Sequence, residues 1–153
     1  MIPVIILGIL SLDQLSKFII TRNLSIHQSV PIIPNIFHIT FINNRGAAFG
    51  ILKDQTHFFV LTSLGAVVLI FLELKNNRHK KLYCASLSLV LAGALGNLVD
   101  RVFLGYVIDF LDFRVWPVFN LADSAITIGA VLLGWQLLGH KDTHKRCIQK
   151  SVK

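Results

Sequence analysis

Four long apolar segments constrain the fold of this chain more than any other feature of its sequence. They cover residues 2–20, 57–74, 82–103 and 118–138. Each has about the 20 residues that an α-helix needs to cross the hydrocarbon core of a bilayer. Only 15% of all residues are charged, against about 25% in a typical soluble domain. We therefore expect an all-α membrane protein with four transmembrane helices, in which residues 1–153 form one integral membrane domain.

The basic residues indicate how the spans are oriented. The net charge of +7 could suggest a nucleic-acid partner, but the lysines and arginines gather beside apolar segments. They cluster in the connection 75–81 and in the tail 139–153. Because cytoplasmic connections of membrane proteins are enriched in Lys and Arg, we expect both termini and this basic tail to be cytoplasmic, and no nucleic-acid partner. The connections near 21–55 and 103–117 then face the other side.

Residues 24–50 differ in character from the spans around them. Two prolines interrupt this region, and apolar and polar residues alternate along 36–42, which is typical of a β-strand with one buried face. The turn-forming sequence NNRG follows at 43–46, and ordinary turn chemistry is the simplest role for its polar side chains. This pattern predicts a small extramembrane β-sheet platform between the first and second spans.

Ionisable residues interrupt the first and third spans. A charged side chain at the centre of a membrane helix costs about 2.5–3.5 kcal/mol on insertion scales, so such residues are functional candidates. Asp13 and Lys17 are four residues apart and share one helix face, which predicts either an ion pair near the interface or a role in positioning a site. In the third span Asn97, Asp100 and Arg101 also share one face, and an Asp100–Arg101 ion pair that ends the span is the plainest interpretation.

The fourth span carries a polar stripe without a basic residue. Asn120, Asp123, Ser124 and Thr127 follow the i, i+3, i+4, i+7 spacing of one helix face. Asp123 therefore lacks an ion-pair partner on its own helix, which makes it the strongest candidate for a functional acid. The preceding connection adds two further acids, Asp109 and Asp112.

Acids that meet at a membrane surface can carry out hydrolysis. When two carboxyl groups approach each other they share one proton; the ionised member can then activate water while the protonated member donates to a carbonyl oxygen. The sequence has no HExxH, GxSxG or glycine-rich phosphate motif, so we expect no metal and no cofactor. The pattern alone leaves open a channel or transporter subunit that binds cations, and a small interaction protein whose polar stripe holds helices together. A transport pathway predicts polar positions further along the fourth span, but residues 128–135 are apolar.

Five sequence blocks resemble, in order and spacing, the lipoprotein signal peptidases, also called signal peptidase II. The blocks are DQLSK (13–17), NRGAAFG (44–50), GALGNLVDR (93–101), GYVIDFLDF (105–113) and FNLADSAITIGA (119–130). The resemblance implies an aspartic endopeptidase of the bacterial plasma (inner) membrane. Its partners would be membrane lipids and diacylglyceryl-modified prolipoproteins, from which it removes the signal peptide just before the lipidated cysteine. We expect it to work as a monomer with its active site toward the outer leaflet.

The resemblance also implies which residues form the site. It identifies Asp109 and Asp123 as the catalytic aspartates and excludes Asp112, a choice that the pattern alone leaves open. It further implies supporting residues that bind substrate or orient the two acids, namely Asn44, Asn97, Arg101, Asn120 and Asp13. The role implied for Asp13 is structural.

Overall fold

The computed structural model describes residues 1–46, 55–77 and 79–151, with side chains described as far as residue 138. Within these ranges four helices are long and apolar enough to cross a membrane. They are α1 (Ile2–Asn23), α2 (Thr56–Asn76), α3 (Lys81–Leu104) and α4 (Leu121–Ser151), of which Leu121–Leu138 is the apolar part. The predicted fold class is confirmed. The membrane-spanning parts begin and end within three residues of the predicted spans, while helix α4 continues beyond its predicted span end at 138 to Ser151.

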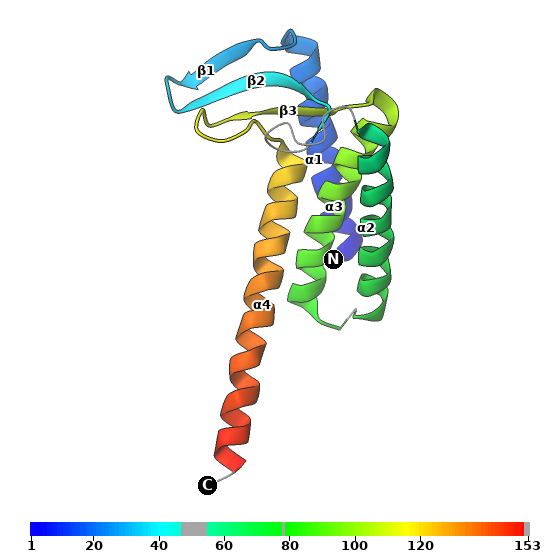
Figure 1. Cartoon of the computed structure of the whole chain (residues 1–153), viewed down its shortest axis with the longest axis vertical. Helices are drawn as coiled ribbons and strands as arrows, with labels where there is room; N and C mark the ends of the chain where they lie inside the picture. The colour runs from blue at the N-terminus through cyan, green and yellow to red at the C-terminus, as the bar shows by residue number, and fades with distance from the viewer. Residues whose placement is uncertain (47–54, 78, 152–153) are drawn as a thin grey trace.

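Helix α3 lies at the centre of the membrane region, and α1, α2 and α4 pack against it (Figure 1). Half of the residues in its apolar, membrane-spanning part are buried, which is far more than in the other three helices. Two glycines permit this close packing. A Cβ added at Gly93 would collide with the carbonyl oxygen of Ala122 in α4, and one added at Gly96 would lie 2.6 Å from Oδ2 of Asp13 in α1. Small residues of this kind let helix backbones approach closely in a membrane.

A three-stranded antiparallel sheet sits at one end of the helices (Figure 1). Its order is β1 (Ser29–Ile33), β2 (Phe37–Asn44) and β3 (Val107–Asp112). The first two strands confirm the predicted platform, whose last residues, 47–50, lie outside the described residues. The third strand corrects the prediction: the sheet is not confined to the chain between α1 and α2, because the connection between α3 and α4 also enters it.

Local residues explain why β3 follows α3 so closely. Gly105 ends α3 with a φ of 82°, a left-handed conformation that glycine adopts without steric cost and that often ends helices. The β-branched and aromatic residues after it favour a strand. Strand β3 is almost wholly buried, and its register on β2 places Asp109 opposite Ile42.

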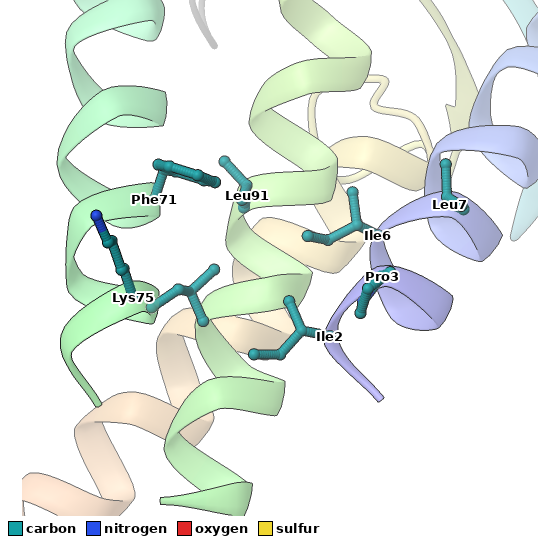
Figure 2. A pocket seen from close by; sticks show the side chains of 8 residues that line it. Ile2, Pro3, Ile6, Leu7, Phe71, Lys75 and Leu91 are labelled. Atoms are coloured by element: carbon teal, nitrogen blue, oxygen red, sulfur yellow. The ribbon is translucent and has the colours of Figure 1, made fainter. Parts of the chain in front are cut away.

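The half of the molecule away from the sheet holds an apolar groove of about 540 Å³. The groove lies between α1 and α2, and Leu91 of α3 also lines it (Figure 2). Among the described residues that line it, Lys75 is the one with an ionisable side chain. The lining offers no pair of acids and no nucleophile. The chemistry predicted from the sequence therefore belongs to the other end of the molecule, where the sheet meets the helices.

Candidate active site

Asp109 and Asp123 line the same cavity, which has a volume of about 380 Å³. Asp109 comes from the middle of β3 and is only 2% exposed. Asp123 comes from the first turn of α4 and is partly buried. The remaining predicted site residues that line this cavity are Asn44, Asn97 and Arg101. The structure thus brings together residues from β2, α3, β3 and α4.

Asn120 joins the two aspartates and starts the helix that carries one of them. It immediately precedes α4, and its Oδ1 accepts a hydrogen bond from the backbone N–H of Asp123 at 2.9 Å. The Asp123 carboxylate in turn accepts from the backbone N–H of Asn120 at 3.3 Å. This reciprocal pair is a capping box. The amide nitrogen of Asn120 also donates to Oδ1 of Asp109 at 2.7 Å, so one fully buried side chain touches both acids.

Two more asparagines complete the hydrogen bonding of the acids. Asn44, the last residue of β2, donates its amide N–H to Oδ2 of Asp109 at 2.8 Å. Asn97 of α3 donates to Oδ1 of Asp123 at 2.8 Å, and its own Oδ1 accepts from Asn120 at 3.1 Å. Every carboxylate oxygen of the two acids therefore accepts a hydrogen bond from an asparagine.

Burial changes the acidity of Asp109. Removal from water raises the pKa of its carboxyl group, and the negative charge of Asp123 raises it further, to about 7. Hydrogen bonds from Asn44 and Asn120 and the positive charge of Lys17 oppose this rise without cancelling it. At neutral pH Asp109 is thus poised between its protonated and ionised forms, which is the range in which a catalytic acid or base works best.

Asp112 differs from Asp109 in position and in charge. The sequence placed Asp112 in the connection before the fourth span, and in the structure Asp112 ends β3 and is only 5% exposed. Burial raises the pKa of its carboxyl group, but hydrogen bonds from Thr40 and Arg114 outweigh burial, and the pKa lies below its ordinary value. Its ion pair with Arg114, at 3.0 Å, adds to this effect. Asp112 is therefore held ionised and is poorly suited to give up or share a proton.

Asp13 lies outside the cavity, in a buried cluster behind it. Its Oδ2 pairs with Nζ of Lys17 at 2.8 Å, and the same ammonium pairs with Oδ2 of Asp100 at 2.8 Å. The Asp13–Lys17 pair is confirmed, and both side chains are buried inside the protein. Asp100 is ion-paired as expected, although with Lys17 of α1 and not with its neighbour Arg101.

Sequence reasoning missed several residues of the site. The sequence analysis treated Lys17 only as the ion-pair partner of Asp13. A lysine inside an apolar span, four residues after an aspartate, was the signal that could have pointed to a role near the site. The apolar side of the cavity comes from residues of β3, of the β3–α4 connection and of α4, which carry no polar signature: Val107, Trp116, Pro117, Val118, Phe119 and Ile126. Arg101, besides lining the cavity, places its guanidinium 4.9 Å from the ring centroid of Phe59 in α2. In the described part of the chain, no three His, Cys, Asp or Glu side chains form a cluster that could hold a metal.

Comparison with known proteins shows the family. Residues 5–139 match the family model described as signal peptidase (SPase) II. The chain belongs to the signal peptidase II family. It is 49% identical to the lipoprotein signal peptidase of Moorella thermoacetica, over 85% of this chain and 87% of that protein. It is 46% identical to the one of Geobacter sulfurreducens, over 88% and 89% of the two chains.

Solved structures agree with this family assignment. The fold matches one described as a bacterial membrane enzyme with a TM-score of 0.86 and 35% identity, covering 93% of this chain and 88% of that one. A second bacterial membrane enzyme matches with a TM-score of 0.83 and 34% identity, over 90% and 92% of the chains. As a signal peptidase II family member with four membrane-spanning helices, the chain is a peptidase and a multi-pass protein of the bacterial inner membrane. The channel and helix-association hypotheses are thereby set aside.

Proposed function

We propose that this chain is an aspartic endopeptidase that removes the signal peptide from diacylglyceryl-modified prolipoproteins, just before the lipidated cysteine. The observation that carries the proposal is the meeting of Asp109 and Asp123, two acids from different elements, in one cavity where Asn120 bonds to both. The names of the relatives support the substrate class. No metal and no cofactor enter the mechanism.

The two acids have different roles in the proposed reaction. A pKa of about 7 makes Asp109 the member that holds the proton near neutrality. Asp123 lies in the first turn of α4, where the positive end of the helix dipole stabilises a negative charge. The Asp123 carboxylate takes a proton from water, the water oxygen bonds to the scissile carbonyl carbon, and Asp109 gives its proton to the carbonyl oxygen. When the intermediate collapses, the C–N bond breaks, Asp123 gives its proton to the leaving nitrogen, and a hydroxyl group of the intermediate returns a proton to Asp109 as the new carboxyl group forms.

The supporting residues hold these groups and the substrate in place. Asn44, Asn97 and Asn120 orient the carboxyl groups through the hydrogen bonds described above. Arg101 lies on the cavity wall, where it can bind backbone carbonyl groups of the extended substrate. Strands β1 and β2 form the platform against which that segment lies.

The lipid on the substrate sets the depth at which the site must work. Each methylene group of an acyl chain contributes about 0.8 kcal/mol to membrane binding, so a cysteine with two acyl chains stays close to the bilayer surface. The two acids belong to β3 and to the first turn of α4, and these two elements lie where the sheet meets the helices (Figure 1). With both termini cytoplasmic, as the basic segments favour, this end faces the outer leaflet. We further propose that one copy of the chain, in contact with membrane lipids, is sufficient for activity.

The decisive experiment measures cleavage of a lipid-modified precursor by purified protein. Asp109→Asn and Asp123→Asn should each lower the rate by at least about 1,000-fold, as expected for groups that transfer protons at the reacting atoms. Asp112→Asn is the matched control, because Asp112 lies in the same strand but outside the cavity. It should keep a rate within a few-fold of wild type. Wild-type processing by folded, inserted Asp109→Asn and Asp123→Asn proteins would refute the mechanism.

A further inference from the structure

Lys17 is a buried cation whose hydrogen-bonding capacity is fully used. It is 2% exposed, and an ammonium group has three N–H donors. These reach Asp13 Oδ2 at 2.8 Å, Asp100 Oδ2 at 2.8 Å and Asn97 Oδ1 at 3.2 Å. Two of the three acceptors balance its charge, but the third is a neutral amide that bonds to Asp123.

The Lys17 cluster, made of Lys17, Asp13 and Asp100, also bonds to the two elements that carry the catalytic acids. Oδ1 of Asp13 accepts the backbone N–H of Ala122, the residue before Asp123, at 2.9 Å. Oδ2 of Asp100 accepts the backbone N–H of Ile108, the residue before Asp109, at 3.1 Å. The cluster therefore fixes the backbone beside both acids.

The hydrogen bonds of the Asn97 side chain fit only one orientation of its amide group. The side-chain oxygen of Asn97 accepts from Lys17 and from Asn120, while its nitrogen donates to Asp123. If this amide turned over, its NH₂ group would face the Lys17 ammonium and its oxygen would face the Asp123 carboxylate. Both contacts would be repulsive. The position of Lys17 thus determines that Asn97 presents a donor to Asp123.

We propose that Lys17 is a positioning residue, which acts through Asn97 to hold Asp123 in the ionised, water-activating form. This inference rests on the proposed function. Asp123 faces two other acids, Asp109 in β3 and Asp13 in α1, and Arg101 of α3 adds a positive charge. Lys17 opposes the negative charge of these neighbours, and its own charge also lowers the pKa of Asp109.

The test is a pH–rate profile for cleavage of a lipidated precursor. In Lys17→Met the pair of acids loses a nearby cation, so the ionisation of each acid becomes harder. Both limbs of the bell-shaped pH–rate profile should therefore move to higher pH by about one unit. The kcat should fall about 10- to 100-fold while KM stays near wild type, because Lys17 does not line the cavity. Lys75→Met, which removes an exposed cation from α2 at the other end of the molecule, should leave the profile and kcat unchanged.

Two further variants test the route through Asn97. Asn97→Asp keeps an acceptor for Lys17 and removes no buried cation, so it tests the inference even if Lys17→Met does not fold. It replaces the donor to Asp123 by a further negative charge, and both changes should lower kcat and move the pH–rate profile to higher pH. In an Asn97→Ala background, adding Lys17→Met should cost at most about 3-fold more, since residues that act as a unit are not additive.

The outcomes separate this inference from the proposed function. A Lys17→Met protein with lower yield but a wild-type profile would show a purely structural role and overturn the inference. So would an unmoved profile in Asn97→Asp, or fully additive losses in the double variant. In each of those cases the aspartate mechanism would still stand if Asp109→Asn and Asp123→Asn proteins are inactive. If those two proteins are active, both the aspartate mechanism and this inference are wrong.

Discussion

Asn120 offers the sharpest test of how the two acids are linked, because its side chain contacts them through different atoms. Its oxygen caps α4, and its nitrogen donates to Asp109 at 2.7 Å. Serine also caps helices well, but its shorter side chain cannot reach Asp109. Asn120→Ser therefore removes the bond to Asp109 and keeps the cap, whereas Asn120→Ala removes both. The nitrogen of Asn120 also donates to Oδ1 of Asn97 at 3.1 Å and to the carbonyl oxygen of Ile108 at 3.2 Å, and Asn120→Ser and Asn120→Ala remove these two bonds alike.

The size of each effect follows from the interaction that is lost. A hydrogen bond to a charged group contributes about 1.5–3 kcal/mol, and one pKa unit corresponds to about 1.4 kcal/mol. The bond from Asn120 lowers the pKa of Asp109, so its loss raises that pKa by about 1–2 units above the present value of about 7. The same loss should reduce kcat by about 10- to 100-fold. The cap contributes about 1 kcal/mol of stability, and only Asn120→Ala should lose it.

The assay combines a pH–rate profile with thermal unfolding in detergent. Both variants should show the alkaline limb of the bell moved to higher pH by a similar amount, and Asn120→Ala should also unfold at a lower temperature than Asn120→Ser. An alkaline limb that stays in place in both variants would show that Asn120 does not control the proton on Asp109, and the reasoning would fail.

Three further predictions follow from the same contacts. Because the folded-state pKa of Asp109 is raised from 3.8 to about 7, its contribution to stability is fully present below about pH 4 and is lost as pH rises toward 7. Asp109→Asn should therefore unfold at a higher temperature than wild type at pH 8 but not at pH 4, and equal shifts at both pH values would contradict this. Gly96→Ala should lower stability by about 1–3 kcal/mol and reduce activity, because the added Cβ meets Asp13; Gly8→Ala, which meets nothing within 4 Å, should do neither. Purified enzyme treated with a chelator should keep its activity, and a loss reversed by added metal would argue against hydrolysis by two aspartates alone.

The sequence predicts the membrane region well because length and hydropathy act locally. Each span is visible as its own apolar run, and the alternation along 36–42 marks β2 in the same way. Gly93 and Gly96 are a local signal of the same kind, since small residues in a span favour close helix packing. The start of α4 was placed three residues early, at 118 instead of Leu121, because the two residues before the capping residue Asn120 are also apolar.

Strand β3 was missed because its partner is far away in the sequence. Val107–Asp112 has only six residues, and β-branched and aromatic residues occur in connections as well as in strands. Asn44 and Asp109, which the sheet brings into hydrogen-bonding contact, are 65 residues apart. The choice between Asp109 and Asp112 depends on this strand, since residues three apart in a strand point to opposite faces. Local sequence could not supply that choice.

The Lys17 cluster was hidden for a related reason. Asp13 and Lys17 are visible as a helical pair, but Asp100 has an arginine next to it in the sequence, which made a local ion pair the simpler interpretation. The structure instead pairs Asp100 with a lysine more than 80 residues earlier. Burial decides this outcome, because an ammonium group that is 2% exposed needs opposite charges close by and an acceptor for each of its N–H donors.

The separation of Lys17 from the two acids leaves the pKa of Asp109 near neutral. An opposite charge in direct contact lowers the pKa of a carboxyl group by about 1–3 units, as Arg114 helps to do for Asp112. Here Asn97 stands between Lys17 and Asp123. The cation thus orients the donor to Asp123, while Asp109 keeps a pKa of about 7. A lysine bonded directly to either acid would hold that acid ionised, and a pair that must share one proton could then no longer exchange it with substrate.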